Sequence, residues 1–182
     1  MKLLICSDIH GDISCVNKIL EIFNKNAYDR LVILGDILYH GPRNDLPSGY
    51  APKEVISALN AVADRIIAVR GNCDTEVDQM VLNFPVLADY AVLLLDGVAV
   101  YLTHGHKYSP SNPMPLKSGD VMLYGHTHVL KVDMIGDNCF INPGSITIPK
   151  ENNPASYMSY EDGEFTILDF CGNKIKQISI KQ

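Results

Sequence analysis

Positive charge is scarce in this sequence. Its 182 residues include 15 lysines and arginines against 21 acidic residues, which gives a net charge of -6. A protein held to a nucleic-acid polymer by a broad basic face needs the opposite balance. Long apolar runs are also missing, because the stretch at 3–6, preceded by Lys2, ends at once in Ser7 and Asp8 and is too short for a membrane span or secretion signal. We therefore expect a cytoplasmic protein with no membrane anchor, and the composition disfavours a nucleic-acid polymer as its partner.

Cysteine pairing is absent as well. The chain has an odd number of cysteines and no Cys-x-x-Cys spacing, so neither a disulfide framework nor a zinc knuckle is predicted. The five are Cys6, Cys15, Cys73, Cys139 and Cys171, and we expect free thiols. With 47% hydrophobic residues, no internal repeat and no low-complexity tract, residues 1–182 are predicted to form one domain with a substantial core.

The first half of the chain alternates strand-like and helix-like segments. Strands are predicted at 2–7, 31–35 and 65–70, and helices at 12–26, 53–63 and 74–82, with a loop rich in proline and glycine at 41–52. In the first helix Val16, Ile19 and Phe23 recur at helical spacing, and Asp12 or Ser14 could cap it.

The second half is predicted to be rich in strands. We expect them at 91–96, 98–103, 120–124, 129–135, 138–142, 156–161, 164–170 and 174–181, with turn pairs such as Asp96-Gly97 and Asp162-Gly163 between several of them. This pattern favours an α/β fold with one sheet built from βα units and another from hairpins, packed face to face with helices outside.

Polar residues follow five of the strand-like runs. They are Asp8, His10, Asp36, Asn72, His104, His126 and His128. A sheet can deliver side chains from distant parts of the sequence to one point beyond its strand ends. Each residue has an ordinary alternative, since a lone aspartate or asparagine after a strand is more often a turn or cap residue. Their joint occurrence at successive strand ends favours a metal site.

The predicted ligand types define the ion. Imidazole and carboxylate suit Mn²⁺, Zn²⁺, Fe²⁺, Ni²⁺ or Co²⁺, and the lack of positioned thiolates argues against a closed structural zinc site. Seven ligands are more than one ion takes from protein while leaving room for substrate, so we expect two divalent ions, with Mn²⁺ preferred. Asp36 is the candidate shared carboxylate, which would hold the ions roughly 3.5–4 Å apart for in-line displacement at phosphorus.

A charge count explains why this ligand set fits phosphoester chemistry. Two divalent ions bring four positive charges, Asp8 and Asp36 remove two, and a bridging hydroxide removes a third. One positive charge remains, because neutral histidines and Asn72 remove none. Such a centre attracts a phosphate anion and lowers the pKa of its bound water towards neutrality.

The ordered motifs of residues 8–128 resemble the calcineurin-like metallophosphoesterase signature. They are Asp8-x-His10, Gly35-Asp36, Gly71-Asn72, His104-Gly105-His106 and Gly125-His126-Thr127-His128. Segments 35–44, 70–80, 142–145 and 148–150 further resemble the YfcE-type bacterial phosphodiesterases. The resemblance implies a four-layer αββα sandwich of two mixed β-sheets flanked by helices, and self-association. It also implies two ion sites, formed by Asp8, His10, Asp36 and His128 and by Asp36, Asn72, His104 and His126.

Several neighbours are further candidates. Many family members carry histidine after the ligand asparagine, where this chain has Cys73, and a neutral thiol is a poorer proton donor. Substrates with good leaving groups should then be favoured, although Cys73 could also be a small buried hydrophobe. Asp74 is either catalytic or the cap of the next helix. Arg43 and His106 are candidate substrate contacts, with solvent exposure as the alternative for both.

These observations predict a metal-dependent phosphodiesterase acting on small phosphoesters by direct attack of a metal-bridging hydroxide. Its catalytic residues would be Asp36, Asn72, Cys73, Asp74 and His104. His40 is expected to be a surface or supporting residue, and the turn 142–145 is expected to shape a wall near the ions. Two alternatives stay open: a non-catalytic scaffold on the same fold, as in the retromer subunit that resembles this family, and a nuclease, which would need a basic tracking surface.

Overall fold

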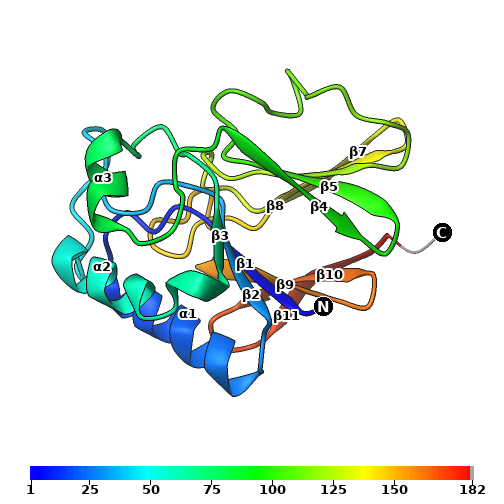
Figure 1. Ribbon diagram of the computed structural model, residues 1–182. Coiled ribbons are helices and arrows are strands. Elements are labelled where there is room, and N and C mark those ends of the chain that lie inside the picture. Colours follow the sequence, from blue (N-terminus) through cyan, green and yellow to red (C-terminus); the bar gives the residue numbers. More distant parts are fainter. Residues whose placement is uncertain (181–182) are drawn as a thin grey trace.

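Two mixed β-sheets pack face to face in the computed structural model, which describes residues 1–180 (Figure 1). The six-stranded sheet has the order β11-β10-β9-β1-β2-β3 and the other has the order β4-β5-β6-β8-β7. The first contains β1 (Leu3–Cys6), β2 (Arg30–Ile33), β3 (Ile66–Ala68), β9 (Ser156–Glu161), β10 (Glu164–Asp169) and β11 (Lys174–Ser179). The second contains β4 (Tyr90–Leu95), β5 (Val98–Thr103), β6 (Val121–Leu123), β7 (Lys131–Ile135) and β8 (Asn138–Asn142). The predicted pair of mixed sheets is confirmed.

Helices α1 (Ile13–Lys25) and α2 (Pro52–Asn60) cover the outer face of the six-stranded sheet (Figure 1). Asp12 is the N-cap of α1 and accepts a hydrogen bond from the backbone N–H of Cys15 at 3.0 Å, which confirms that predicted cap. The helix predicted at 53–63 ends earlier, at Asn60, and a short 3₁₀ helix follows at Ala63–Arg65. The third helix, α3, is Glu76–Val81.

Besides the core beneath α1 and α2, a second hydrophobic core lies between the two sheets. It joins side chains that alternate along β1, β5, β6, β8, β9 and β10, so one face of each strand is buried against the opposite sheet. Buried members include Ile5, Val100, Leu123, Met158 and Phe165. On the outer face of the second sheet, Tyr108 and Leu116 from the loop between β5 and β6 pack against Met122, Tyr124 and Phe140. The layer outside the second sheet is therefore formed by this loop and not by a helix.

The division of strands between the sheets differs from the prediction. β9 pairs antiparallel with β1, and β10 and β11 continue from it, so these hairpins extend the sheet built from βα units. The prediction that hairpins form a sheet of their own is wrong in this respect. The reason is that β1 has two edges that need partners: β2 satisfies one and β9 the other. The strand predicted at 174–181 ends at Ser179, and its last residue lies outside the described part.

Parallel pairing brings the functional loops together. β1, β2 and β3 run parallel, and so do β5, β6 and β8. Their carboxyl ends therefore lie at a common edge of each sheet, where the loops after β1, β2, β3, β5 and β6 begin. Within residues 1–180, no helix has the length and apolar character needed to cross a bilayer. The single domain over residues 1–182 stays a prediction.

Candidate metal centre

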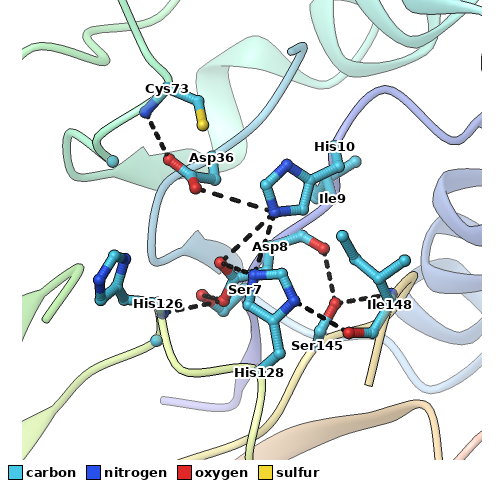
Figure 2. Close-up of polar contacts among 12 residues, drawn as sticks. Ser7, Asp8, Ile9, His10, Asp36, Cys73, His126, His128, Ser145 and Ile148 are labelled. Atoms are coloured by element: carbon cyan, nitrogen blue, oxygen red, sulfur yellow. Dashed lines mark hydrogen bonds and ion pairs between the residues drawn. The ribbon is translucent and has the colours of Figure 1, made fainter. Parts of the chain in front are cut away.

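Most of the predicted ligands meet at this edge (Figure 2). Three overlapping groups of residues could each hold a metal ion, because within each group the possible ligand atoms, one per residue, lie within 4.8 Å of one another. The groups are Asp8, His10 and His128; Asp8, Asp36 and His104; and His10, Asp36 and Cys73. Each histidine and aspartate in them follows a different strand or shares a short loop with another. The structure thus brings these residues, which are up to 120 positions apart in the sequence, together in one polar cluster at the strand ends.

The backbone at these positions is strained. Five of the seven predicted ligands have φ between 48° and 67°, in the left-handed region that residues other than glycine rarely adopt: Asp8, His10, Asp36, His126 and His128. Such a conformation costs on the order of 1–3 kcal/mol per residue and persists only where the surroundings impose it. This concentration of strain on the predicted ligands is typical of a functional site.

Backbone carbonyls fix the tautomers of two facing histidines. His10 Nδ1 donates to the carbonyl of Tyr39 at 2.8 Å, and His128 Nδ1 donates to the carbonyl of Ile148 at 2.9 Å. A carbonyl can only accept, so in the neutral rings the proton lies on Nδ1 and both Nε2 atoms carry lone pairs. These Nε2 atoms lie 3.3 Å apart, and His128 Nε2 lies 3.2 Å from Asp8 Oδ1.

Asp8 completes a set of donor atoms that fits a cation. Its Oδ2 accepts hydrogen bonds from Ser7 Oγ at 2.6 Å and from the backbone N–H of His126 at 3.1 Å, whereas its Oδ1 is buried with no hydrogen-bond partner. Three lone-pair atoms, from Asp8, His10 and His128, therefore face one another. Because no donor among the described residues 1–180 satisfies Asp8 Oδ1, and the two Nε2 atoms face it, the arrangement fits a divalent metal ion.

Asp36 lies between this group and His104. Its Oδ2 is 3.7 Å from His10 Nε2 and 3.4 Å from His104 Nε2. His104 Nδ1 donates to the carbonyl of Leu34 at 2.7 Å, so its Nε2 also presents a lone pair in the neutral ring, 3.1 Å from Asn72 Oδ1. The carboxylate of Asp36 thus lies between two groups of candidate ligands, and these buried His/Asp clusters are consistent with a site for two metal ions.

The electrostatics of the cluster favour bound positive charge. Burial alone would raise the pKa of Asp8, but the imidazoles of His10 and His128 hold it below its usual range. Burial alone would lower the pKa of His104, but the carboxylates of Asp36 and Asp8 raise it to about 9. Both shifts show that the carboxylates stay ionised and draw protons, or metal ions, to the histidines around them.

Asp74 organises the loop of Asp36 and does not cap α3. Its carboxylate accepts hydrogen bonds from the backbone N–H groups of Asp36 at 2.8 Å, Ile37 at 2.8 Å and Gly71 at 2.7 Å. The N-cap of α3 is Thr75, so the predicted capping role of Asp74 is wrong. Burial, the largest effect, raises the pKa of Asp74 even though these N–H groups lower it. Asp74 does not line the cavity described below.

Asn72 and His126 lie at the margin of the cluster. Asn72 is exposed and contacts His104, as given above. The half-buried ring of His126 lies 5.1 Å, centroid to centroid, from that of His104, and burial lowers its pKa. In the described part of the chain, the close groups given above do not include His126.

A cavity of about 560 Å³ opens beside the cluster. Its lining residues are His10, Asp36, Gly41, Pro42, Arg43, Asn44, Asn72, Cys73, His126, Thr127, His128 and Lys150. The predicted substrate contact Arg43 thus faces the cavity. The other, His106, is not among the lining residues. Its ring lies 5.3 Å from that of His104, and burial together with the charge of His104 lowers its pKa to about 4.

Cys73 borders both the cavity and Asp36. Its backbone N–H donates to Asp36 Oδ1 at 2.8 Å, and its thiol accepts from Asn72 Nδ2 at 3.2 Å. Burial and the charge of Asp36 raise the pKa of the thiol to about 12, so it is neutral at pH 7. His40, in contrast, packs between the rings of Tyr39 and Tyr50 and does not line the cavity.

Sequence reasoning gave no individual role to Ser7, Ser145 or Lys150. Ser7 holds Asp8 Oδ2, Ser145 Oγ donates to the carbonyl of Asp8 at 2.9 Å, and Lys150 lines the cavity. The turn at 142–145 does lie next to the candidate ligands, as expected. A signal for Lys150 was present, because it ends one of the segments that resemble the family, but its position relative to His128 depends on the tertiary structure.

The fold and the cluster of candidate ligands at the strand ends are those of a metallophosphoesterase. The chain belongs to the calcineurin-like phosphoesterase superfamily, whose domain model matches residues 1–162.

Individual relatives support this membership. Over 168 residues the chain is 48% identical to phosphodiesterase YfcE of Escherichia coli K12, covering 92% of this chain and 91% of the relative. It is 32% identical over 152 residues to phosphodiesterase MJ0936 of Methanocaldococcus jannaschii, covering 79% and 83%. The solved structure of the E. coli phosphoesterase YfcE matches with a TM-score of 0.97 at 46% identity over 100% of both chains.

The fold is also shared with Vps29. The structure of Chaetomium thermophilum Vps29 matches with a TM-score of 0.65 at 16% identity, covering 98% of this chain and 97% of that one. At this identity the match shows the fold alone.

Proposed function

We propose that this protein is a metal-dependent phosphodiesterase that hydrolyses small phosphoesters at the cluster of Asp8, His10, Asp36 and the facing histidines. The observation that carries the proposal is the convergence of candidate ligand atoms. Asp8 Oδ1 and the Nε2 atoms of His10 and His128 meet beside Asp36 Oδ2, next to an open cavity. The names of the relatives, both phosphodiesterases, point to the same reaction.

The proposed ligand sets are those that the family resemblance implies. Asp8, His10, Asp36 and His128 would hold one ion, and Asp36, Asn72, His104 and His126 the other, with Mn²⁺ as the preferred metal. When bound, the ions supply Lewis acidity and a hydroxide at neutral pH. The place of His126 in the second set rests on the resemblance, since its ring lies 5.1 Å from that of His104 and it is not part of the close groups.

The residues around the ions have separate tasks in this proposal. Asp36 would help to hold both ions, and Arg43, which lines the cavity, would attract the anionic substrate. Cys73 lines the same cavity as a neutral thiol, so it gives the departing oxygen little acid assistance. Phosphoesters with good leaving groups should therefore be the better substrates.

A scaffold role and a nuclease role fit the chain less well. All seven predicted ligands are present in the sequence, which a protein acting only as a scaffold would not need. A net charge of -6 gives no broad basic surface for a nucleic-acid polymer. A cytoplasmic location and self-association stay predictions.

The test compares metal-free protein with protein reconstituted with Mn²⁺ on a panel of phosphoesters, beginning with bis-p-nitrophenyl phosphate and p-nitrophenyl phosphate. Turnover should require metal, should favour the diester, and should fall at least about 100-fold in Asp36→Asn. Asp64→Asn is the matched control, because Asp64 is exposed, lies in the 3₁₀ helix that precedes β3 and does not line the cavity. Full activity of Asp36→Asn without bound metal would refute the proposal.

A further inference from the structure

Two cations at the cavity lack acidic partners. Arg43 and Lys150 both line it, and both are exposed. In the part of the chain that the structure describes, the ion pairs of lysine and arginine are made by other residues, namely Lys2, Arg70, Lys107 and Lys131. A chain with a net charge of -6 therefore places two cations without a recorded ion pair at the cavity beside its candidate ligands.

Arg43 stands on a loop that also holds His10. The carbonyl of Tyr39 accepts the hydrogen bond from His10 Nδ1, and Asn44 closes the loop by donating from Nδ2 to the carbonyl of His40 at 2.8 Å. The loop of Arg43 is thereby joined to His10 through Tyr39, and Asn44 closes it across Arg43.

Lys150 stands on the equivalent loop at His128. The carbonyl of Ile148 accepts from His128 Nδ1, and the backbone N–H of Lys150 donates to the carbonyl of His128 at 3.0 Å. Ser145 Oγ accepts from the backbone N–H of Ile148 at 2.9 Å and donates to the carbonyl of Asp8 (Figure 2). This second loop is therefore tied to the site as firmly as the first.

The two cations thus belong to the two loops that hold a facing pair of histidines. The Nε2 atoms of His10 and His128 are 3.3 Å apart, and each histidine is held by the loop that carries one cation. In the proposed function the ions would bind the phosphate group whose ester bond is cleaved. Arg43 and Lys150 would then be able to bind another part of the substrate. A cavity of about 560 Å³ has room for more than one phosphate group.

We propose that Arg43 and Lys150 together select phosphodiesters that carry a second phosphate group, an inference that rests on the proposed function. Guanidinium binds phosphate through paired hydrogen bonds and ammonium binds it as a point charge. Because both side chains are exposed, each should contribute a moderate preference, about five- to tenfold, that weakens as salt is added.

The test uses two diesters with the same leaving group: thymidine 5′-(p-nitrophenyl phosphate) with and without a 3′-phosphate. The ratio of their kcat/KM values should favour the 3′-phosphorylated substrate in the Mn²⁺-loaded protein. Arg43→Gln and Lys150→Gln should each reduce that ratio about five- to tenfold, and Lys150→Arg should retain it. Lys176→Gln is the matched control, since Lys176 is an exposed lysine on β11 and does not line the cavity.

Binding is measured in parallel by calorimetry with thymidine 3′,5′-bisphosphate and thymidine 5′-phosphate. If neither diester is cleaved, the proposed function fails, and the Kd ratio of the two nucleotides still decides the selection. Tighter binding of the bisphosphate that is lost in both glutamine variants supports the inference. Equal kcat/KM values and equal Kd values in the unmodified protein, or a preference that survives both variants, overturn it.

Discussion

Replacing Asp74 with asparagine tests whether the backbone around Asp36 is held by a single buried carboxylate. Asp74 Oδ2 accepts from the N–H groups of Asp36 and Gly71, and its Oδ1 accepts from that of Ile37. An asparagine has one acceptor oxygen. In its better orientation it keeps the first two bonds and turns its NH₂ group towards the N–H of Ile37, which is fully buried.

The expected cost follows from these contacts. A buried donor left without an acceptor costs about 1–3 kcal/mol, and the two remaining hydrogen bonds weaken because their acceptor is no longer charged. Asp74→Asn should therefore lower the free energy of unfolding by about 2–4 kcal/mol. This is less than the usual total stability of about 5–15 kcal/mol, so the variant should still fold.

The metal site should respond as well. Asp36 has a left-handed backbone with φ of 55°, and two of the three hydrogen bonds to Asp74 come from Asp36 and its neighbour Ile37. Weaker hydrogen bonds let the Asp36 carboxylate move away from its position between His10 and His104. The amount of bound metal per chain should therefore fall, even though Asp74 itself does not line the cavity.

The assay is urea unfolding of metal-free protein, followed by elemental analysis after reconstitution with Mn²⁺. Asp64→Asn should unfold within about 0.5 kcal/mol of the unmodified protein, as surface substitutions usually do. An Asp74→Asn protein as stable as that control, and with full metal occupancy, would show that the charge of Asp74 does not hold the loop.

Three further predictions concern the same site. In Gly71→Ala, a Cβ would lie 2.9 Å from Asp36 Cγ and closer still to its backbone nitrogen, so the variant should lose metal, measured by elemental analysis, and about 1–3 kcal/mol of stability; normal occupancy would contradict this. In metal-free protein the pKa of His104, raised to about 9, should give stability that is present below about pH 6.5 and lost as the pH rises through 9. Urea unfolding across that range should show this slope, and His104→Gln should flatten it. Because Cys73 is a poor acid, nitrophenyl phosphoesters should be cleaved much faster than alkyl ones, and Cys73→His should help the alkyl substrates more, by up to about 10²-fold; equal changes for both classes would mean that another group donates the proton.

The residue types at the strand ends carried most of the predictable information. Apolar runs followed by Asp8, Asp36 or His104 predicted both the strands and the edge at which their polar residues meet, because parallel strands place their carboxyl ends together. Helix α1 and its cap at Asp12 were predictable for a similar reason, since periodicity and capping are local properties of the sequence.

The structure alone decided which sheet the last three strands join and what several polar residues do. Alternation within 156–179 predicts strands but does not identify the edge they pair with, because backbone hydrogen bonds are the same for every residue type. The same reason applies at the site. Tyr39 and Ile148 fix the tautomers of His10 and His128 through main-chain carbonyls, and Asp74 acts on main-chain N–H groups. None of these contacts leaves a pattern in the side chains, so the sequence determined which atoms could bind the ions and the tertiary structure determined how they are held.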